Sequence, residues 1–397
     1  MKLASKETCT GCNACAYVCP KKCISFKTDG TYDIAYPVID ENQCINCGKC
    51  QKVCPALNPL EGVTPLNAYA AWSFDSEERS TSASGGIATE IYKYALKNGW
   101  SIVGAAFCED FKVHLELSND WESIKKFKNS KYVFSSVSDV LSEIARNLKL
   151  GSKIIVIALP CQIAAIRKIF HKDLDNLLLV DLVCHGIMPY VYLKQYISYM
   201  EKSFHKKVKK LTFRDPKEGT QNYFLSLYDQ EGNCIYSSDK LKDSYQFAFH
   251  RMVAYRENCY HCYYANNKRI SDITLGDYKG LGECAPCSFS NEKVSCILVN
   301  TEKGKKYIDE LLENKFIEAE NRPVEEPIKG DSQLRHPSVK SFSRRLWEKS
   351  YNGDFVNVTQ YVYRISKFWE CILGICHLPK RIFRKALRIL SSKEWCK

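Results

Sequence analysis

Two runs of closely spaced cysteines near the start of the chain carry its clearest chemical signal. Each run has the form C-x₂-C-x₂-C-x₃-C-P, and together they comprise Cys9, Cys12, Cys15, Cys19, Cys44, Cys47, Cys50 and Cys54. Cysteine thiolates are the usual ligands of 4Fe-4S clusters, and two-residue spacing lets the backbone wrap around one corner of such a cluster. The first part of the chain is therefore expected to bind two 4Fe-4S clusters and to transfer electrons.

The fourth cysteine of each run is expected to bind the cluster of the other run, as in two-cluster ferredoxins. One predicted ligand set is Cys9, Cys12, Cys15 and Cys54, and the other is Cys44, Cys47, Cys50 and Cys19. Zinc sites usually need two separated C-x₂-C pairs, so a zinc interpretation leaves the duplicated spacing and the prolines unexplained. Cys23 follows the first run and is interpreted as a small buried residue.

The cysteine content also indicates a cellular compartment. The chain has 21 cysteines among 397 residues, with 45% hydrophobic and 26% charged residues. A secreted protein would show an apolar leader with a small-residue cleavage site. No such pattern follows Met1. Thiols in a long chain of this kind are typical of a reducing compartment, where they serve as metal ligands or catalysts. We therefore expect a cytoplasmic, globular protein rather than a disulfide-stabilised one.

Alternating strands and helices are expected after a linker that is rich in proline. The segments 152–159 and 176–183 are apolar runs typical of buried parallel strands, and a helix is expected between them. Cys161 and Cys184 directly follow these strands and are expected at one sheet edge. The predicted fold combines α+β and α/β parts. It consists of a two-cluster ferredoxin domain (1–60), a larger α/β domain (66–330) and a basic, mainly helical extension (331–397).

The middle of the chain resembles the beta-subunit family of coenzyme F-420 hydrogenases and dehydrogenases, which are iron–sulfur flavoproteins. The matching stretches are STSASGGIATEI (80–91), NSKYVFSS (129–136), LPCQIAAIR (159–167), DLVCHGIMP (181–189) and the pair Cys259/Cys262 followed by Arg269 and SDITLGDY. The resemblance implies FAD, iron–sulfur clusters and electron transfer. Two positions depart from the family pattern: Ala158-Leu159 stands where members usually carry Gly-Thr, and Lys279 where they usually carry Trp. The substrate is therefore expected to differ from that of other members.

Four later cysteines are expected to bind a third 4Fe-4S cluster. They are Cys161, Cys184, Cys259 and Cys262. Two of them follow parallel strands, the C-x₂-C pair supplies two more thiolates, and four is the number that a cluster needs. One alternative is a zinc ribbon formed by Cys259/Cys262 with Cys284/Cys287, whose spacing is slightly longer than the usual zinc pattern. Another is that these cysteines are simply buried.

A flavin site is expected where small residues precede a helix. The residues are Ser82, Ser84, Gly85 and Gly86. Unpaired N–H groups at a helix N-terminus bind phosphate, and glycines allow it to come close. Together with the resemblance this predicts contact with the FAD pyrophosphate, whereas an ordinary helix cap is the alternative.

Other candidate site residues lie further along the chain. Ser130, Lys131 and Ser135 are expected to contact anionic groups, or otherwise to form a solvated loop. His185 is the candidate catalytic acid or base, and its alternative role is a hydrogen bond to a cluster or to the flavin.

The positive charge of the chain is concentrated at its end. The formal net charge is +12, and most of the excess lies in residues 331–397. No nucleic-acid-binding motif is present, so nucleic acid is not an expected partner. The segment PKRIFRKALRIL (379–390) is typical of a basic amphipathic helix that lies on an anionic membrane surface, here the inner face. Packing of this helix on the protein itself is the alternative.

The expected function is that of an iron–sulfur flavoprotein oxidoreductase. Electrons would pass between FAD and the clusters, with a deazaflavin, a ferredoxin or another reducible small molecule as donor or acceptor. One alternative is a non-catalytic electron-transfer subunit that docks a redox partner protein within a larger complex. A second is a reductase in bacterial polysaccharide biosynthesis.

Overall fold

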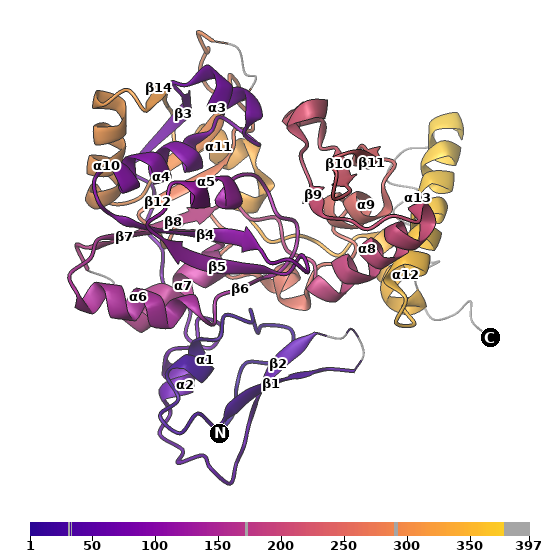
Figure 1. Ribbon diagram of the computed structural model, residues 1–397, viewed down its shortest axis with the longest axis horizontal. Helices are drawn as coiled ribbons and strands as arrows, with labels where there is room; N and C mark the ends of the chain where they lie inside the picture. Colours follow the sequence, from indigo (N-terminus) through magenta and orange to yellow (C-terminus); the bar gives the residue numbers. More distant parts are fainter. Residues whose placement is uncertain (31, 33, 171–173, 290–292, 377–397) are drawn as a thin grey trace.

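The computed structural model describes residues 1–30, 32, 34–170, 174–289 and 293–376. Figure 1 shows three parts: a small N-terminal unit, a large sheet with helices on both faces, and a second lobe beside the sheet. The mixture of a ferredoxin-like unit and a larger α/β unit confirms the expected fold class.

The N-terminal unit is built from two similar halves. Helices α1 (Ala14–Tyr17) and α2 (Lys49–Lys52) are single turns that begin inside the cysteine runs. Strands β1 (Ile24–Thr28) and β2 (Ala35–Ile39) form an antiparallel hairpin. Asn13 and Gly48, at equivalent positions before the two helices, have φ values of 58° and 73°. The left-handed turn at each of them reverses the chain within each run.

The large sheet has nine strands in the order β14-β3-β13-β12-β8-β7-β4-β5-β6. Its centre is parallel, as the sequence predicts. There β7 (Ile154–Ala158) lies between β4 (Ser101–Phe107) and β8 (Leu177–Leu182), and β12 (Ile273–Asp277) pairs with β8. The other strands are β3 (Asn67–Ser73), β5 (Val113–Ser118), β6 (Ser135–Ser136), β13 (Ser295–Val299) and β14 (Ile317–Arg322). Strand β13 runs antiparallel to both β12 and β3, so the sheet is mixed.

Helices cover both faces of this sheet (Figure 1). On one face, α4 (Ile87–Lys97) and α10 (Glu302–Glu313) bury Ile91 and Ile308. On the other face, α6 (Val140–Lys149) and α7 (Pro160–Phe170) bury Ile144 and Ile163. The remaining helices near this sheet are α3 (Ser76–Thr81), α5 (Glu122–Phe127) and α11 (Glu325–Gly330). Strands that are buried on both faces explain the continuous apolar runs in the sequence.

The second lobe combines a small antiparallel sheet with several α-helices. Its strands are β9 (Lys210–Thr212), β10 (Leu225–Tyr228) and β11 (Cys234–Ser238). Its helices are α8 (Tyr190–Phe204), α9 (Ser244–His250), α12 (Phe342–Ser350) and α13 (Phe355–Cys376). Trp347 and Phe355, both fully buried, pack against Tyr192. The described part of the C-terminal extension is mainly helical, as expected, and α12 and α13 contribute to the core of this lobe.

The amphipathic segment 379–390 lies outside the described residues. No helix in the described part of the chain is long and apolar enough to span a membrane.

Candidate functional site

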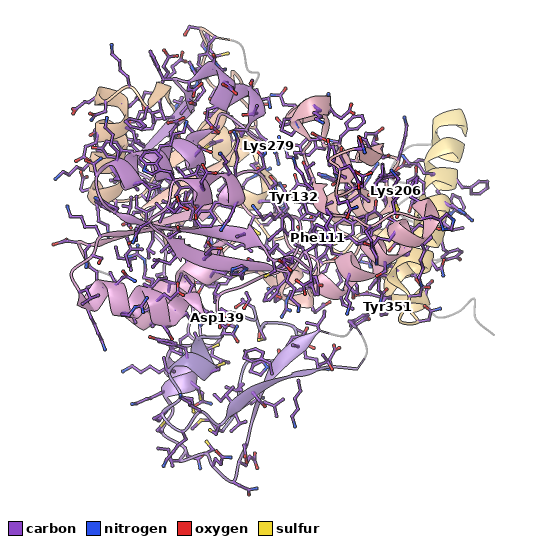
Figure 2. The ribbon with its side chains drawn as sticks, in the orientation of Figure 1. Phe111, Tyr132, Asp139, Lys206, Lys279 and Tyr351 are labelled. Carbon is purple, nitrogen blue, oxygen red and sulfur yellow. The ribbon has the colours of Figure 1, made fainter. Side chains whose placement is uncertain are left out.

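A central cavity of about 670 Å³ lies between the large sheet and the second lobe. Residues that end or follow three parallel strands contribute to its wall: Ala158 and Leu159 after β7, Cys184 after β8, and Lys279 after β12. Ligands of open α/β sheets bind at the carboxyl ends of such strands. Tyr132 and Lys279, labelled in Figure 2, lie where the two lobes face each other.

Most residues predicted to bind flavin line this cavity. They are Ser82, Ser84, Gly86, Ser130, Lys131 and Ser135. Gly85 is placed differently, because its N–H donates to the Ser295 Oγ at 2.9 Å. A Cβ atom at this position would lie 2.4 Å from the Ala71 carbonyl oxygen. Gly85 therefore allows the loop to pack directly on β3 and β13, while its neighbours face the cavity.

Lys131 places an amino group at the cavity without a carboxylate partner in the described part of the chain. Its Nζ donates to the carbonyl oxygens of Phe127, Lys128 and Asn129 at 3.4, 3.2 and 3.4 Å. Burial lowers the pKa of Lys131 to about 7. A bound anion at this position would favour the charged form of the lysine.

His185 belongs to a polar group on the cavity wall. Lys279 Nζ lies 2.8 Å from His185 Nε2 and 2.9 Å from a carboxylate oxygen of Asp331. Burial, and then the charge of Lys279, lower the pKa of His185. Because an ammonium group only donates hydrogen bonds, His185 Nε2 accepts, and the neutral ring carries its proton on Nδ1.

The second lobe supplies cavity residues that the sequence analysis missed. His250 lines the cavity; burial lowers its pKa to about 3, and its Nε2 has no hydrogen-bond partner in the described part of the chain. Arg214 pairs with Asp277 at 2.9 Å, and Lys240 lies over the ring of Tyr223. These residues belong to no recognisable motif. Their position depends on how the second lobe packs on the sheet.

The wall of the cavity carries more positive than negative charge. The basic residues that line it are Lys128, Lys131, Arg214, Lys240 and Lys279, and the carboxylates are Asp277 and Asp331. Such a cavity favours an anionic ligand.

The four cysteines of the expected third cluster lie together in the structure. Cys161 is in the first turn of α7, Cys184 follows β8, and Cys259 and Cys262 lie in and after the 3₁₀ helix Glu257–His261. Burial and the thiols Cys262, Cys184 and Cys259 raise the pKa of Cys161. Burial raises the pKa of Cys259 to about 12. Four crowded thiols ionise together only when a cation compensates them, so this group fits a metal cluster.

The alternative zinc ribbon is not assembled in the structure. The loop with Cys284 and Cys287 lies against α11, where the Cys284 N–H donates to Glu326, and Arg322 contacts the carbonyl oxygens of the residues between the two cysteines. Among the residues that the structure describes, no three His, Cys, Asp or Glu side chains converge as they would around a single metal ion. A zinc ion holds its sulfur ligands at about 2.3 Å, whereas the thiolates of a 4Fe-4S cluster surround a larger core.

The cysteines of the N-terminal unit form two groups, and each group includes a cysteine from the other run. Burial and the thiols Cys12, Cys9 and Cys54 raise the pKa of Cys15 to about 12. A small pocket is lined by Cys19 together with Cys44, Cys47 and Cys50. Both groups have the composition of the crossed ligand sets. Cys23 also lines this pocket, and its Sγ lies 3.5 Å from that of Cys19, so this buried thiol adjoins the second group.

The N-terminal unit contacts the large sheet next to these thiols. Tyr264 Oη donates to the Pro55 carbonyl oxygen at 2.9 Å. Ala14 of α1 and Ala165 of α7 belong to one buried apolar cluster. The thiol of Cys12 is also among the groups that raise the pKa of Cys161. The group of Cys161 thus lies between the cavity, which Cys184 lines, and the group that contains Cys12.

The cysteine groups and the fold define an iron–sulfur redox protein, and comparisons with known proteins specify its family. Models of the 4Fe-4S dicluster domain match residues 8–58 and 36–99. Models of the N-terminal part and the C terminus of the coenzyme F420 hydrogenase/dehydrogenase beta subunit match residues 68–142 and 151–325, together more than half of the chain. The chain therefore belongs to the coenzyme F420 hydrogenase/dehydrogenase beta-subunit family and carries an N-terminal 4Fe-4S dicluster domain.

Similar proteins come from Methanosarcina and Methanocaldococcus species. One subunit of the F(420)H(2) dehydrogenase of Methanosarcina mazei is 23% identical over 356 residues, which are 85% of this chain and 94% of that protein. The coenzyme F420-dependent sulfite reductase of Methanocaldococcus jannaschii is 24% identical over 387 residues, which are 90% of this chain and 53% of that protein. A chain from the F420-reducing NiFe hydrogenase complex of Methanosarcina barkeri has a TM-score of 0.47 and 22% identity, and the match covers 70% of this chain and 88% of that one.

Proposed function

We propose that this protein is a flavin-dependent oxidoreductase that binds FAD in the central cavity and three 4Fe-4S clusters at its cysteine groups. The observation that carries the proposal is the position of Cys184, which lines the cavity and also belongs to the third group of thiols. A redox cofactor in the cavity would therefore lie beside an iron–sulfur site. A bound flavin exchanges hydride with small molecules, and 4Fe-4S clusters carry single electrons.

The shape and charge of the cavity support FAD. Its volume of about 670 Å³ falls within the range of roughly 300–1,000 Å³ for ligand pockets. Lys131 and the N-terminus of α4 lie on its wall and would hold the pyrophosphate. Ser130 and Ser135 would provide further hydrogen bonds, and His185 would act as a hydrogen-bond donor through its Nδ1 proton.

The proposed cluster ligands follow the three cysteine groups. They are Cys9, Cys12, Cys15 and Cys54 for one cluster, Cys44, Cys47, Cys50 and Cys19 for another, and Cys161, Cys184, Cys259 and Cys262 for the third. The corresponding domain boundaries are 1–60, 66–330 and 331–397. With the sites in this order, the ferredoxin domain would carry electrons between the large domain and a redox partner.

The names of the relatives support a deazaflavin as the small-molecule partner, with a ferredoxin or another reducible compound as alternatives. Ala158, Leu159 and Lys279, where the chain departs from the family pattern, all line the cavity. These residues therefore support a substrate that differs from that of other members. Because one relative is part of a dehydrogenase with several subunits, a role as an electron-transfer subunit without a substrate of its own is the second candidate.

Metal and flavin analysis of protein purified without oxygen tests this proposal. We expect about twelve irons, one FAD and no zinc per chain. Cys184→Ala should remove about four irons. The control Cys108→Ala, at an exposed thiol outside the three groups, should remove none. Eight irons with one zinc, unchanged by Cys184→Ala, would exclude the third cluster, and protein without flavin would exclude the cavity assignment.

A further inference from the structure

Arg256 is a buried arginine that lacks a carboxylate partner in the described part of the chain. Four other buried arginines each form an ion pair with an Asp or Glu: Arg214, Arg269, Arg322 and Arg344. Arg256 is only 3% exposed. The neighbouring carboxylate, Glu257, pairs instead with Lys340 and Arg344. An unpaired buried charge is strongly unfavourable, so a stable protein needs a compensating negative group near this guanidinium.

The contacts of Arg256 place it at the boundary between the N-terminal unit and the large domain. Its Nη2 lies 3.5 Å from the Cys9 carbonyl oxygen, and its Nε lies 3.4 Å from Asn258 Oδ1. The guanidinium stacks on Phe134 at 4.8 Å. Gly11, between Cys9 and Cys12, makes room for it, because a Cβ atom there would lie 3.2 Å from Arg256 Nη2. The side chain is thus fixed beside the first cysteine run.

The thiols near Arg256 come from two different groups. Its positive charge favours the thiolate form of Cys9, in the group shared with Cys12, and of Cys259, in the group shared with Cys184. The Cys259 N–H also donates to the Arg256 carbonyl oxygen. The guanidinium of Arg256 thus contacts the backbone of Cys9, and the main-chain carbonyl of the same residue contacts the backbone of Cys259.

We propose that Arg256 is a shared counter-ion for two iron–sulfur clusters, one on each side of the domain boundary. This inference rests on the cluster assignments of the proposed function. A 4Fe-4S cluster with four thiolates carries net negative charge, which increases on reduction, and its potential depends on nearby charges. One fixed positive charge between two such sites compensates both and favours reduction of both. It also makes the docking of the N-terminal unit depend on bound clusters.

Redox titration followed by EPR spectroscopy of the iron-loaded full chain tests this proposal. In Arg256→Gln the midpoint potentials of the clusters at Cys9 and Cys259 should both become more negative. The potential of the cluster at Cys44 should stay unchanged and serves as an internal control. Arg256→Lys keeps the charge and should retain potentials close to those of the wild type. Arg345→Gln, which removes an exposed arginine, should leave the potentials of all three clusters unchanged.

A second variant covers the case in which Arg256→Gln does not fold. Asn258→Asp has nearly the same shape and gives the guanidinium an ion-pair partner, so it should fold and shift the same two potentials in the negative direction. Unchanged potentials at Cys9 and Cys259 in a folded variant with about twelve irons would overturn only the proposed role of Arg256 and leave the cluster assignments in place. A wild-type protein with only about eight irons would instead overturn the third cluster and the proposed function.

Discussion

Lys131 and Arg256 are cations held by backbone or amide oxygen atoms, and neither has a carboxylate partner in the described part of the chain. Both lie beside a position where the protein is expected to bind a negatively charged group. Lys131 could be predicted from its motif, because it belongs to the stretch that resembles the family. Arg256 lies outside every motif, and only its burial beside two cysteine groups indicates its role. The partners of His185 were likewise beyond prediction, because Lys279 and Asp331 are distant in sequence.

Replacing Lys131 tests the anionic end of the cavity. Lys131→Met should weaken FAD binding by about tenfold or more, since a hydrogen bond to a charged group contributes about 1.5–3 kcal/mol. FAD affinity of the wild type should be highest below pH 7, where the free lysine is protonated, and should fall above it, where binding requires uptake of a proton. Isothermal titration at several pH values measures both effects. The control Lys217→Met, at a residue outside the cavity lining, should retain the affinity and its pH dependence, and equal behaviour of both variants would contradict the assignment.

The crossed ligand sets make a separate prediction for Cys19. Cys19→Ala should damage the cluster at Cys44, Cys47 and Cys50, although Cys19 belongs to the first run. EPR spectra of the reduced protein distinguish the clusters. Loss of the signal from the cluster at Cys9, Cys12 and Cys15 would show that the ligands do not cross.

At the level of elements, the sequence predicts the centre of the sheet better than its edges. Strand β7 is apolar throughout, and β8 is apolar apart from Asp181. Both strands alternate with helices, and this pattern predicts their parallel pairing. Strand β13 is equally apolar but antiparallel. An apolar run indicates burial on both faces and carries no information about direction. The placement of the second lobe against the cavity depends on side-chain packing between distant segments, so the sequence does not predict it.

Strand β3 fixes the position of the loop before α4 through its close contact with Gly85. In Gly85→Ala the new Cβ would collide with the Ala71 carbonyl oxygen on β3. We expect the free energy of unfolding to fall by about 1–3 kcal/mol, and flavin occupancy to fall with it because Ser84 and Gly86 are displaced. Gly99→Ala, where nothing lies within 4 Å of the added atom, should cost about 1 kcal/mol through its positive φ and leave flavin binding unchanged. Thermal unfolding and flavin release measure the two effects, and normal stability of Gly85→Ala would contradict the packing argument.

At the scale of the whole molecule, the N-terminal unit is held so that its cysteine group with Cys12 faces the group of Cys161 in the large domain. Tyr264 is buried at this contact and bonds to Pro55, directly after Cys54. Tyr264→Phe removes this hydrogen bond at a cost of about 1 kcal/mol, so amide hydrogen exchange in the N-terminal unit should become about fivefold faster where it requires undocking. The exposed Tyr263 provides the control Tyr263→Phe. Equal exchange in both variants would show that this contact does not hold the unit.

We expect electrons to pass between the cavity and the N-terminal clusters through the cysteine group of Cys184. The most direct measurement is rapid-freeze EPR after photochemical reduction of the FAD-loaded protein, in the wild type and in Cys184→Ala. In the wild type we expect prompt reduction of the N-terminal clusters. In the variant we expect the flavin to be reduced while these clusters remain oxidised. Equally fast reduction of the N-terminal clusters in Cys184→Ala, in protein that iron analysis shows to lack the third cluster, would exclude electron transfer through the group of Cys184.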